Sequence, residues 1–126
     1  MQRIIVDDGL RYIREGVQRD ELYDVLLIDV SYNAVRPLMA PVEEFLLDDE
    51  IQQIYKIIRK NGAVIVNVLT LQKDINEADR VLFVYSRHFP SCYLWSSLNL
   101  IRCYSARKRR KIRGWTTGTN FTIDTL

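Results

Sequence analysis

The sequence predicts an α/β domain whose sheet is mostly parallel and ends in an antiparallel hairpin. Three apolar runs, rich in Val, Leu and Ile, have the length of buried strands: Arg3–Val6, Tyr23–Val30 and Ala63–Leu69. Segments with helical periodicity separate these runs, and such alternation is typical of a parallel sheet. Two further short strands follow with no room for a helix between them, which predicts the antiparallel edge.

Length and composition are those of one domain, or of part of one. The 126 residues are 48% hydrophobic and 27% charged, which is ordinary for a globular protein. No apolar run approaches the roughly 18 residues of a membrane helix, and the N-terminus is no signal peptide. We therefore expect a cytoplasmic protein without membrane contact, in which Cys92 and Cys103 fit as reduced thiols, although a disulfide stays open. Two cysteines and one histidine make no convincing zinc site.

Charge is divided unevenly along the chain. Residues 1–86 hold 10 Lys/Arg and 15 Asp/Glu, whereas residues 87–126 hold 8 Lys/Arg and 1 Asp/Glu. Six of those eight cations lie in the run Arg107–Arg113. We expect residues 1–106 to form the globular part and residues 107–126 to form a basic tail. Its charges are either simply solvated or contact nucleic acid or an acidic protein.

The first helix is expected to start at Asp8 and Gly9. Its apolar face is predicted by residues at helical spacing, namely Leu10, Ile13 and Val17. Asp8 can cap this helix, because its carboxylate can accept a hydrogen bond from an unpaired amide of the first turn.

The central strand, Tyr23–Val30, carries Asp29 near its end. Ligands of open α/β sheets bind outside the carboxyl ends of the strands, where Asp29 would lie. The longest irregular segment, Ser31 to Pro41, follows, and a long loop at this end of a strand is a usual place for function. The simpler interpretation is that Asp29 only caps this loop.

A second helix is expected from about Val42 to Lys60, with a break near Asp48. Its apolar face consists of Leu47, Ile51, Ile54 and Ile58. The pair Asn61-Gly62 would end this helix, since both residues tolerate the left-handed conformation of a C-cap.

A third helix precedes the hairpin. Asp74 and Glu77 have the spacing of a capping box, and Pro90 stops the helix. Its apolar stripe consists of Ile75, Ala78, Leu82 and Tyr85. Cys92–Trp95 and Leu100–Tyr104 then form the two antiparallel strands.

Three segments, Ile5–Ile13, Tyr23–Asp29 and Asn61–Asn67, resemble one known family in their order and spacing. They are similar to the spermidine synthase-like S-adenosylmethionine-dependent methyltransferases, which have the Rossmann-like class I methyltransferase fold. Within that family the chain resembles the C-terminal domain of enzymes that methylate a lysine and the N-terminus of elongation factor one-alpha. The Gly-Trp segment Arg113–Gly118 adds to this resemblance, which covers most of the chain. It implies S-adenosylmethionine as cofactor and a protein substrate such as a translation factor.

The resemblance implies roles for three residues. In the family, the Asp of an Asp-Gly pair after the third strand binds the adenine amino group, and this position matches Asp8. Gly9 would then keep side-chain bulk away from the purine. The Asp that ends the fourth strand faces the reacting end of the cofactor and matches Asp29, which could orient or deprotonate a substrate amine. By residue type alone, Asp8-Gly9 is a plain turn and helix cap.

Two departures from the family pattern limit what the chain is expected to do. Members that transfer aminopropyl groups carry a second carboxylate where this chain has Tyr32, which argues against polyamine synthesis. The family's first two strands and glycine-rich cofactor loop would lie before Arg3, and the five glycines of this chain cannot form that loop. We therefore expect the C-terminal part of a methyltransferase domain, an incomplete fold that is inactive alone and does not bind the cofactor usefully.

Two further expectations follow from the incomplete fold. The missing strands would leave the edge of Tyr23–Val30 unpaired and apolar, so Arg3–Val6 should move beside it or the chain should self-associate there. The alternative function is a non-catalytic binding module, in which Arg107–Arg113 holds RNA or an acidic protein.

Overall fold

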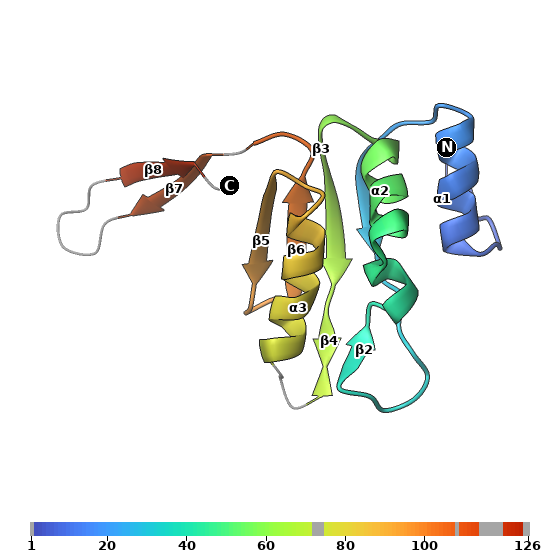
Figure 1. The fold of residues 1–126 in the computed structure, drawn as a ribbon, viewed down its shortest axis with the longest axis horizontal. Coiled ribbons are helices and arrows are strands. Elements are labelled where there is room, and N and C mark those ends of the chain that lie inside the picture. The colour runs from blue at the N-terminus through green and yellow to red at the C-terminus, as the bar shows by residue number, and fades with distance from the viewer. Residues whose placement is uncertain (1, 72–74, 108, 114–119, 125–126) are drawn as a thin grey trace.

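The structure is a computed structural model that describes residues 2–71, 75–107, 109–113 and 120–124. Its elements are α1 (Gly9–Gln18), β1 (Tyr23–Ile28), β2 (Leu38–Ala40), the 3-10 helix η1 (Glu43–Leu46), α2 (Asp48–Ile57), β3 (Ile58–Asn67), β4 (Leu69–Thr70), α3 (Ile75–Ser86), β5 (Ser91–Trp95), β6 (Leu100–Tyr104), β7 (Arg109–Arg113) and β8 (Asn120–Asp124) (Figure 1). None of the helices described is both long and apolar enough to cross a bilayer.

A four-stranded sheet organises the domain in the order β1-β3-β6-β5. Strands β1 and β3 run parallel, whereas the β3–β6 and β6–β5 pairs are antiparallel. The predicted α/β class and the antiparallel hairpin at one edge are thus confirmed. Strands β2 and β4 form a small antiparallel pair, and β7 and β8 form another that stands apart from the main sheet in Figure 1.

Helices α2 and α3 lie on one face of this sheet, and the hydrophobic core lies between the two layers (Figure 1). The sheet contributes the buried side chains of Ile28, Val64, Val66, Ile101 and Cys103. The helices contribute those of Ile51, Ile54, Ile57, Val81 and Tyr85. The Tyr85 hydroxyl donates to the Phe45 carbonyl at 3.0 Å, so burial of this polar group is compensated and α3 is joined to η1.

The opposite face of the sheet is open at β1. Val25 and Leu27 are 56% and 62% exposed, whereas Ile28 is only 3% exposed, because successive strand residues point to opposite faces. Among the described residues, no strand lies on the outer side of β1. Strand β1 therefore has the unpaired, apolar edge that the sequence predicts.

Arg3–Val6 does not form the predicted strand. Ile4 is 96% exposed and Val6 is 98% exposed, so the segment neither pairs nor packs. An extended segment becomes a strand only when a neighbour pairs with its backbone groups, and the described chain places none beside it. The strand prediction is wrong, and the first of the two alternatives expected at the open edge of β1, that Arg3–Val6 moves beside it, is not found.

The helix predicted over Val42–Lys60 is divided and ends earlier. A 3-10 helix occupies Glu43–Leu46, and α2 then runs over Asp48–Ile57 with three acidic residues in its first turn, which complement the helix dipole. Strand β3 begins at once with Ile58, so Asn61-Gly62 lies inside a strand and not at a helix C-cap. The break near Asp48 is confirmed, but the predicted end is wrong.

The third helix and the hairpin agree closely with their predicted positions. Helix α3 spans Ile75–Ser86 and is followed by Pro90 and then by β5. Asp74 of the predicted capping box lies outside the described residues. The Glu77 carboxylate instead accepts hydrogen bonds from the Arg80 guanidinium, at 2.7 and 3.2 Å.

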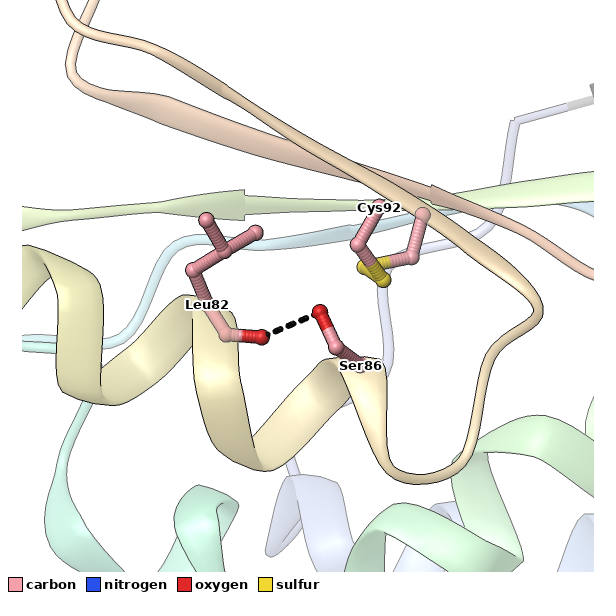
Figure 2. Close-up of a disulfide and its surroundings, with 4 residues drawn as sticks. Leu82, Ser86 and Cys92 are labelled. Carbon is pink, nitrogen blue, oxygen red and sulfur yellow. Dashed lines mark hydrogen bonds between the residues drawn. A yellow bond between two sulfur atoms is a disulfide. The ribbon is translucent and has the colours of Figure 1, made fainter. Parts of the chain in front are cut away.

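Cys92 and Cys103 form a disulfide that joins β5 to β6. The two residues are directly opposite in the antiparallel register and their Cα atoms are 4.1 Å apart, so the two sulfur atoms are close enough to bond. Figure 2 shows the disulfide between the sheet and α3, beside Leu82 and Ser86. The expectation of reduced thiols is thus corrected by the register of the hairpin.

Candidate functional site

Asp8 and Asp29 lie toward the same end of the sheet. Asp29 directly follows β1, and Asp8 directly precedes α1. A connection of four residues, 19–22, joins the end of α1 to the start of β1, so the helix runs antiparallel to the strand. The first turn of α1 therefore lies toward the same end of the domain as the carboxyl ends of β1 and β3 (Figure 1). This is the end at which open α/β sheets bind ligands.

Asp8 caps α1, as its sequence position predicts. Its Oδ1 accepts the amide N–H of Leu10 at 2.9 Å and that of Arg11 at 3.4 Å. Within the described chain, no bond to the other carboxylate oxygen, Oδ2, is present. Gly9 follows, and a Cβ placed there would lie 3.7 Å from Cζ of Phe45, which is an ordinary contact. Packing alone therefore does not require a glycine at this position.

Asp29 is held by a residue of the neighbouring strand. The side-chain amide nitrogen Nδ2 of Asn67 donates to Oδ1 of Asp29 at 2.9 Å. Asn67 is the last residue of β3, and the parallel register pairs Ile28 with Val66 immediately before it. The sequence pattern alone predicts no role for Asn67. The available signal was a polar residue that ends an apolar strand predicted to run parallel to the strand of Asp29.

Tyr32 closes the loop that follows β1. Its hydroxyl accepts the amide N–H of Glu43 at 2.9 Å, and its own N–H donates to the Met39 carbonyl at 2.9 Å. The Arg36 guanidinium lies 4.0 Å from the centre of the Tyr32 ring. Tyr32 thus has a structural role in the loop that follows β1.

The 3-10 helix η1, which follows this loop, is joined to α3 by an ion pair. Arg80 donates to both carboxylate oxygens of Glu43, at 2.7 and 3.1 Å. These hydrogen bonds hold the pKa of Glu43 below its ordinary value. An open groove of about 350 Å³ lies beside the pair and is lined by Glu43, Glu44, Leu46, Leu47, Arg80 and Val84. It contains none of the predicted site residues, so we do not assign the site to it.

The basic run Arg107–Arg113 is described only in part. Arg107 is exposed, and Arg109–Arg113 forms β7, which pairs in antiparallel register with β8. Lys108 and residues 114–119, with the predicted Gly-Trp segment, lie outside the described residues, as do the β7 side chains. For this basic two-stranded ribbon, the structure therefore describes the path of the backbone.

Comparison with solved structures finds the same architecture in a known protein. The chain is similar to the crystal structure of human methyltransferase-like protein 13 in complex with SAH, with a TM-score of 0.67 and 24% sequence identity. The match covers 80% of this chain and 48% of that chain, so this chain spans about half the length of its structural relative.

The fold is a partial class I methyltransferase fold. The predicted resemblance to methyltransferases is thereby confirmed at the level of fold. No family model matches the chain, and no curated protein sequence matches it. The roles assigned to Asp8, Gly9 and Asp29 stay predictions.

Proposed function

We propose that this chain forms part of an S-adenosylmethionine-dependent methyltransferase site, the part that faces the adenine and the reacting centre. We also propose that it binds the cofactor only weakly by itself. The observation that carries the proposal is the pairing of Asp29 with Asn67 at the carboxyl ends of the parallel strands β1 and β3. The structural relative is a complex with SAH, and its shared fold supports the proposal.

Asp8 and Gly9 would hold the adenine. The helix cap uses Oδ1 of Asp8, so Oδ2 can accept a hydrogen bond from an exocyclic amine. The absence of a side chain at Gly9 is not explained by packing, because a Cβ would meet Phe45 only at an ordinary distance. It leaves room for a planar ring to approach the backbone of the first turn.

Asp29 would act at the reacting end. The cofactor supplies an electrophilic methyl group, and the acceptor must present an unprotonated lone pair. A carboxylate within hydrogen-bond reach of an amine can orient its N–H groups or accept its proton. The exposed side chain of Asp29 is available for this role. The substrate class that the resemblance implies is a protein amine, such as one on a translation factor.

The described part of the chain has no glycine-rich loop that could hold the methionine end of the cofactor. Gly9 and Gly16 lie in α1, and Gly62 lies inside β3, so no described glycine-rich loop links a strand to a helix. Each buried polar contact that is not made costs on the order of 1 kcal/mol or more. Several such losses lower the affinity by many tenfold factors.

Amide NMR signals of residues 1–126, titrated with SAH and separately with adenosine at millimolar concentration, test this proposal. We expect both ligands to shift the signal of Gly9, because they share the adenine, and we expect SAH to shift also the signal of Asp29, which faces the reacting end. The Asp8→Asn variant retains a capping oxygen but loses the second acceptor, and should abolish the shift at Gly9. Asp20→Asn, at an exposed turn with a positive φ that asparagine tolerates, is the matched control. Shifts confined to other parts of the molecule would contradict the proposal.

A second candidate function is supported by the β7–β8 ribbon. Strand β7 has the sequence Arg-Arg-Lys-Ile-Arg and, within the described residues, pairs with β8 in a sheet of two strands. We propose that this ribbon binds RNA phosphates. Replacement of the six Lys/Arg residues of Arg107–Arg113 by Gln should weaken binding of single-stranded RNA and flatten its salt dependence. The control removes exposed cations of the body, namely Arg36, Lys56 and Lys60. Equal losses in the two variants would contradict a specific role for the ribbon.

A further inference from the structure

We propose that Asn67 is a positioning residue, which holds the carboxylate of Asp29 in one orientation at the carboxyl end of the sheet. This inference rests on the proposed function and deepens it. It adds Asn67, which lies on a second strand, to the predicted site residues Asp8, Gly9 and Asp29.

The register of the sheet places Asn67 beside Asp29. Ile28 and Val66 are paired in the parallel ladder, so the next residue of each strand lies at the same level. Neighbouring strands are roughly 4.8 Å apart, a gap that a short amide side chain can bridge. The observed separation of 2.9 Å between Asn67 Nδ2 and Asp29 Oδ1 is a hydrogen bond of ordinary length.

The two partners differ in how firmly the fold holds them. Asp29 lies just beyond the end of an edge strand and is exposed, so its side chain alone has several rotamers available. Asn67 is half-buried on β3, which has β1 on one side and β6 on the other, and it pairs there with Leu100. The central strand therefore fixes the amide, and the amide in turn fixes Oδ1 of Asp29.

The hydrogen bond leaves the second carboxylate oxygen available. Within the described residues, Oδ2 of Asp29 has no hydrogen-bond partner. A carboxylate held by one oxygen presents the other in a defined direction, and this is how positioning groups preorganise a reacting group. Asn67 also interrupts an otherwise apolar run, Ala63–Val68, where a polar side chain lowers stability unless it is hydrogen-bonded.

The test uses an S-adenosylmethionine analogue with a primary amine in place of the transferable methyl group, and SAH, which lacks that amine. In the wild-type chain, we expect the carboxyl carbon signal of Asp29 to respond to the analogue more than to SAH. The Asn67→Leu variant has a similar volume but no donor. It should lose this difference at Asp29 and keep the ligand-induced shift at Gly9. Gln52→Leu removes an exposed amide from α2 and should leave both responses unchanged.

The outcomes separate the inference from the proposed function. If the wild-type chain responds and Asn67→Leu gives the same Asp29 difference, Asn67 does not position the carboxylate and the inference is overturned. If neither ligand shifts Gly9 or Asp29 in the wild type, the proposed function itself fails, and the inference with it. Should Asn67→Leu not fold, Asn67→Thr, which suits a strand and has no amide, is expected to show the same loss at Asp29.

Discussion

The backbone of Gly62 lies directly against the carbonyl oxygen of Asp24, because a Cβ at this position would be only 2.7 Å from that oxygen. The Arg59 carbonyl oxygen would be 2.8 Å away. Strands β1 and β3 change register in this region, between Tyr23 and Val25. Only a glycine lets the two backbones approach so closely without displacement.

Gly62→Ala should therefore destabilise the fold. Since two of the three atoms it meets are backbone oxygens and the third is Cγ2 of Ile58, we expect a loss of about 1–3 kcal/mol in the free energy of unfolding, measured by urea titration. Gly9→Ala is the matched control, because its Cβ would meet Phe45 at 3.7 Å, and its effect should stay below about 1 kcal/mol. Equal effects of the two substitutions would show that the close approach at Gly62 does not constrain the sheet.

The ion pair of Glu43 and Arg80 should make stability depend on pH. The pKa of Glu43 is lowered in the folded state, so its contribution is present above the ordinary glutamate value of 4.5 and is lost as the pH falls through the folded value. Both side chains are partly exposed, and we expect about 0.5–1 kcal/mol. Glu43→Gln should be less stable than wild type at pH 7, and the difference should shrink as the pH falls below 4.5 and through the lowered pKa of Glu43. A difference that does not change with pH would exclude the carboxylate charge as its cause.

Reduction of the disulfide should lower stability while the hairpin persists. Cys92 and Cys103 are 11 positions apart in the sequence, and closure of such a loop corresponds to roughly 3 kcal/mol in the chain-entropy description. Urea titration with and without a reducing agent measures this difference, and alkylation followed by mass spectrometry counts the free thiols. Full alkylation without reductant, or an unchanged unfolding midpoint after reduction, would contradict the prediction.

The open edge of β1 should promote self-association. Val25 and Leu27 are exposed large apolar residues on a strand with one unpaired side in the described fold. Leu27→Lys should reduce concentration-dependent scattering, because a charge at a strand edge opposes pairing with a second copy. Val35→Lys changes an exposed apolar residue of the loop and is the control. A monodisperse wild-type monomer at high concentration would contradict this expectation.

Features that depend on residues close together in the sequence could be predicted from it. The cap at Asp8 and the third helix depend on local spacing, and both are present. The Cys92–Cys103 pairing could also have been recognised, because a turn formed by residues 96–99 aligns Trp95 with Leu100 and thus Cys92 with Cys103.

The features that could not be predicted depend on residues far apart in the sequence. Arg3–Val6 has a strand-like sequence, but a strand forms only beside another strand. The boundary between Ile57 and Ile58 could not be located, since two identical apolar residues carry no local signal for the change from helix to strand. The bond from Asn67 to Asp29 required the parallel register of β1 and β3, which the sequence alone did not specify.

Equilibrium dialysis of residues 1–126 with labelled S-adenosylmethionine, beside light scattering of the same sample, tests the central claim most directly. Asp8, Gly9 and Asp29 are present, but the described chain has no glycine-rich loop for the methionine end of the cofactor. We therefore expect a Kd well above the micromolar range and no methyl transfer. NMR at millimolar ligand should still locate the weak contact at Gly9 and Asp29. Micromolar binding by a clean monomer would contradict the account.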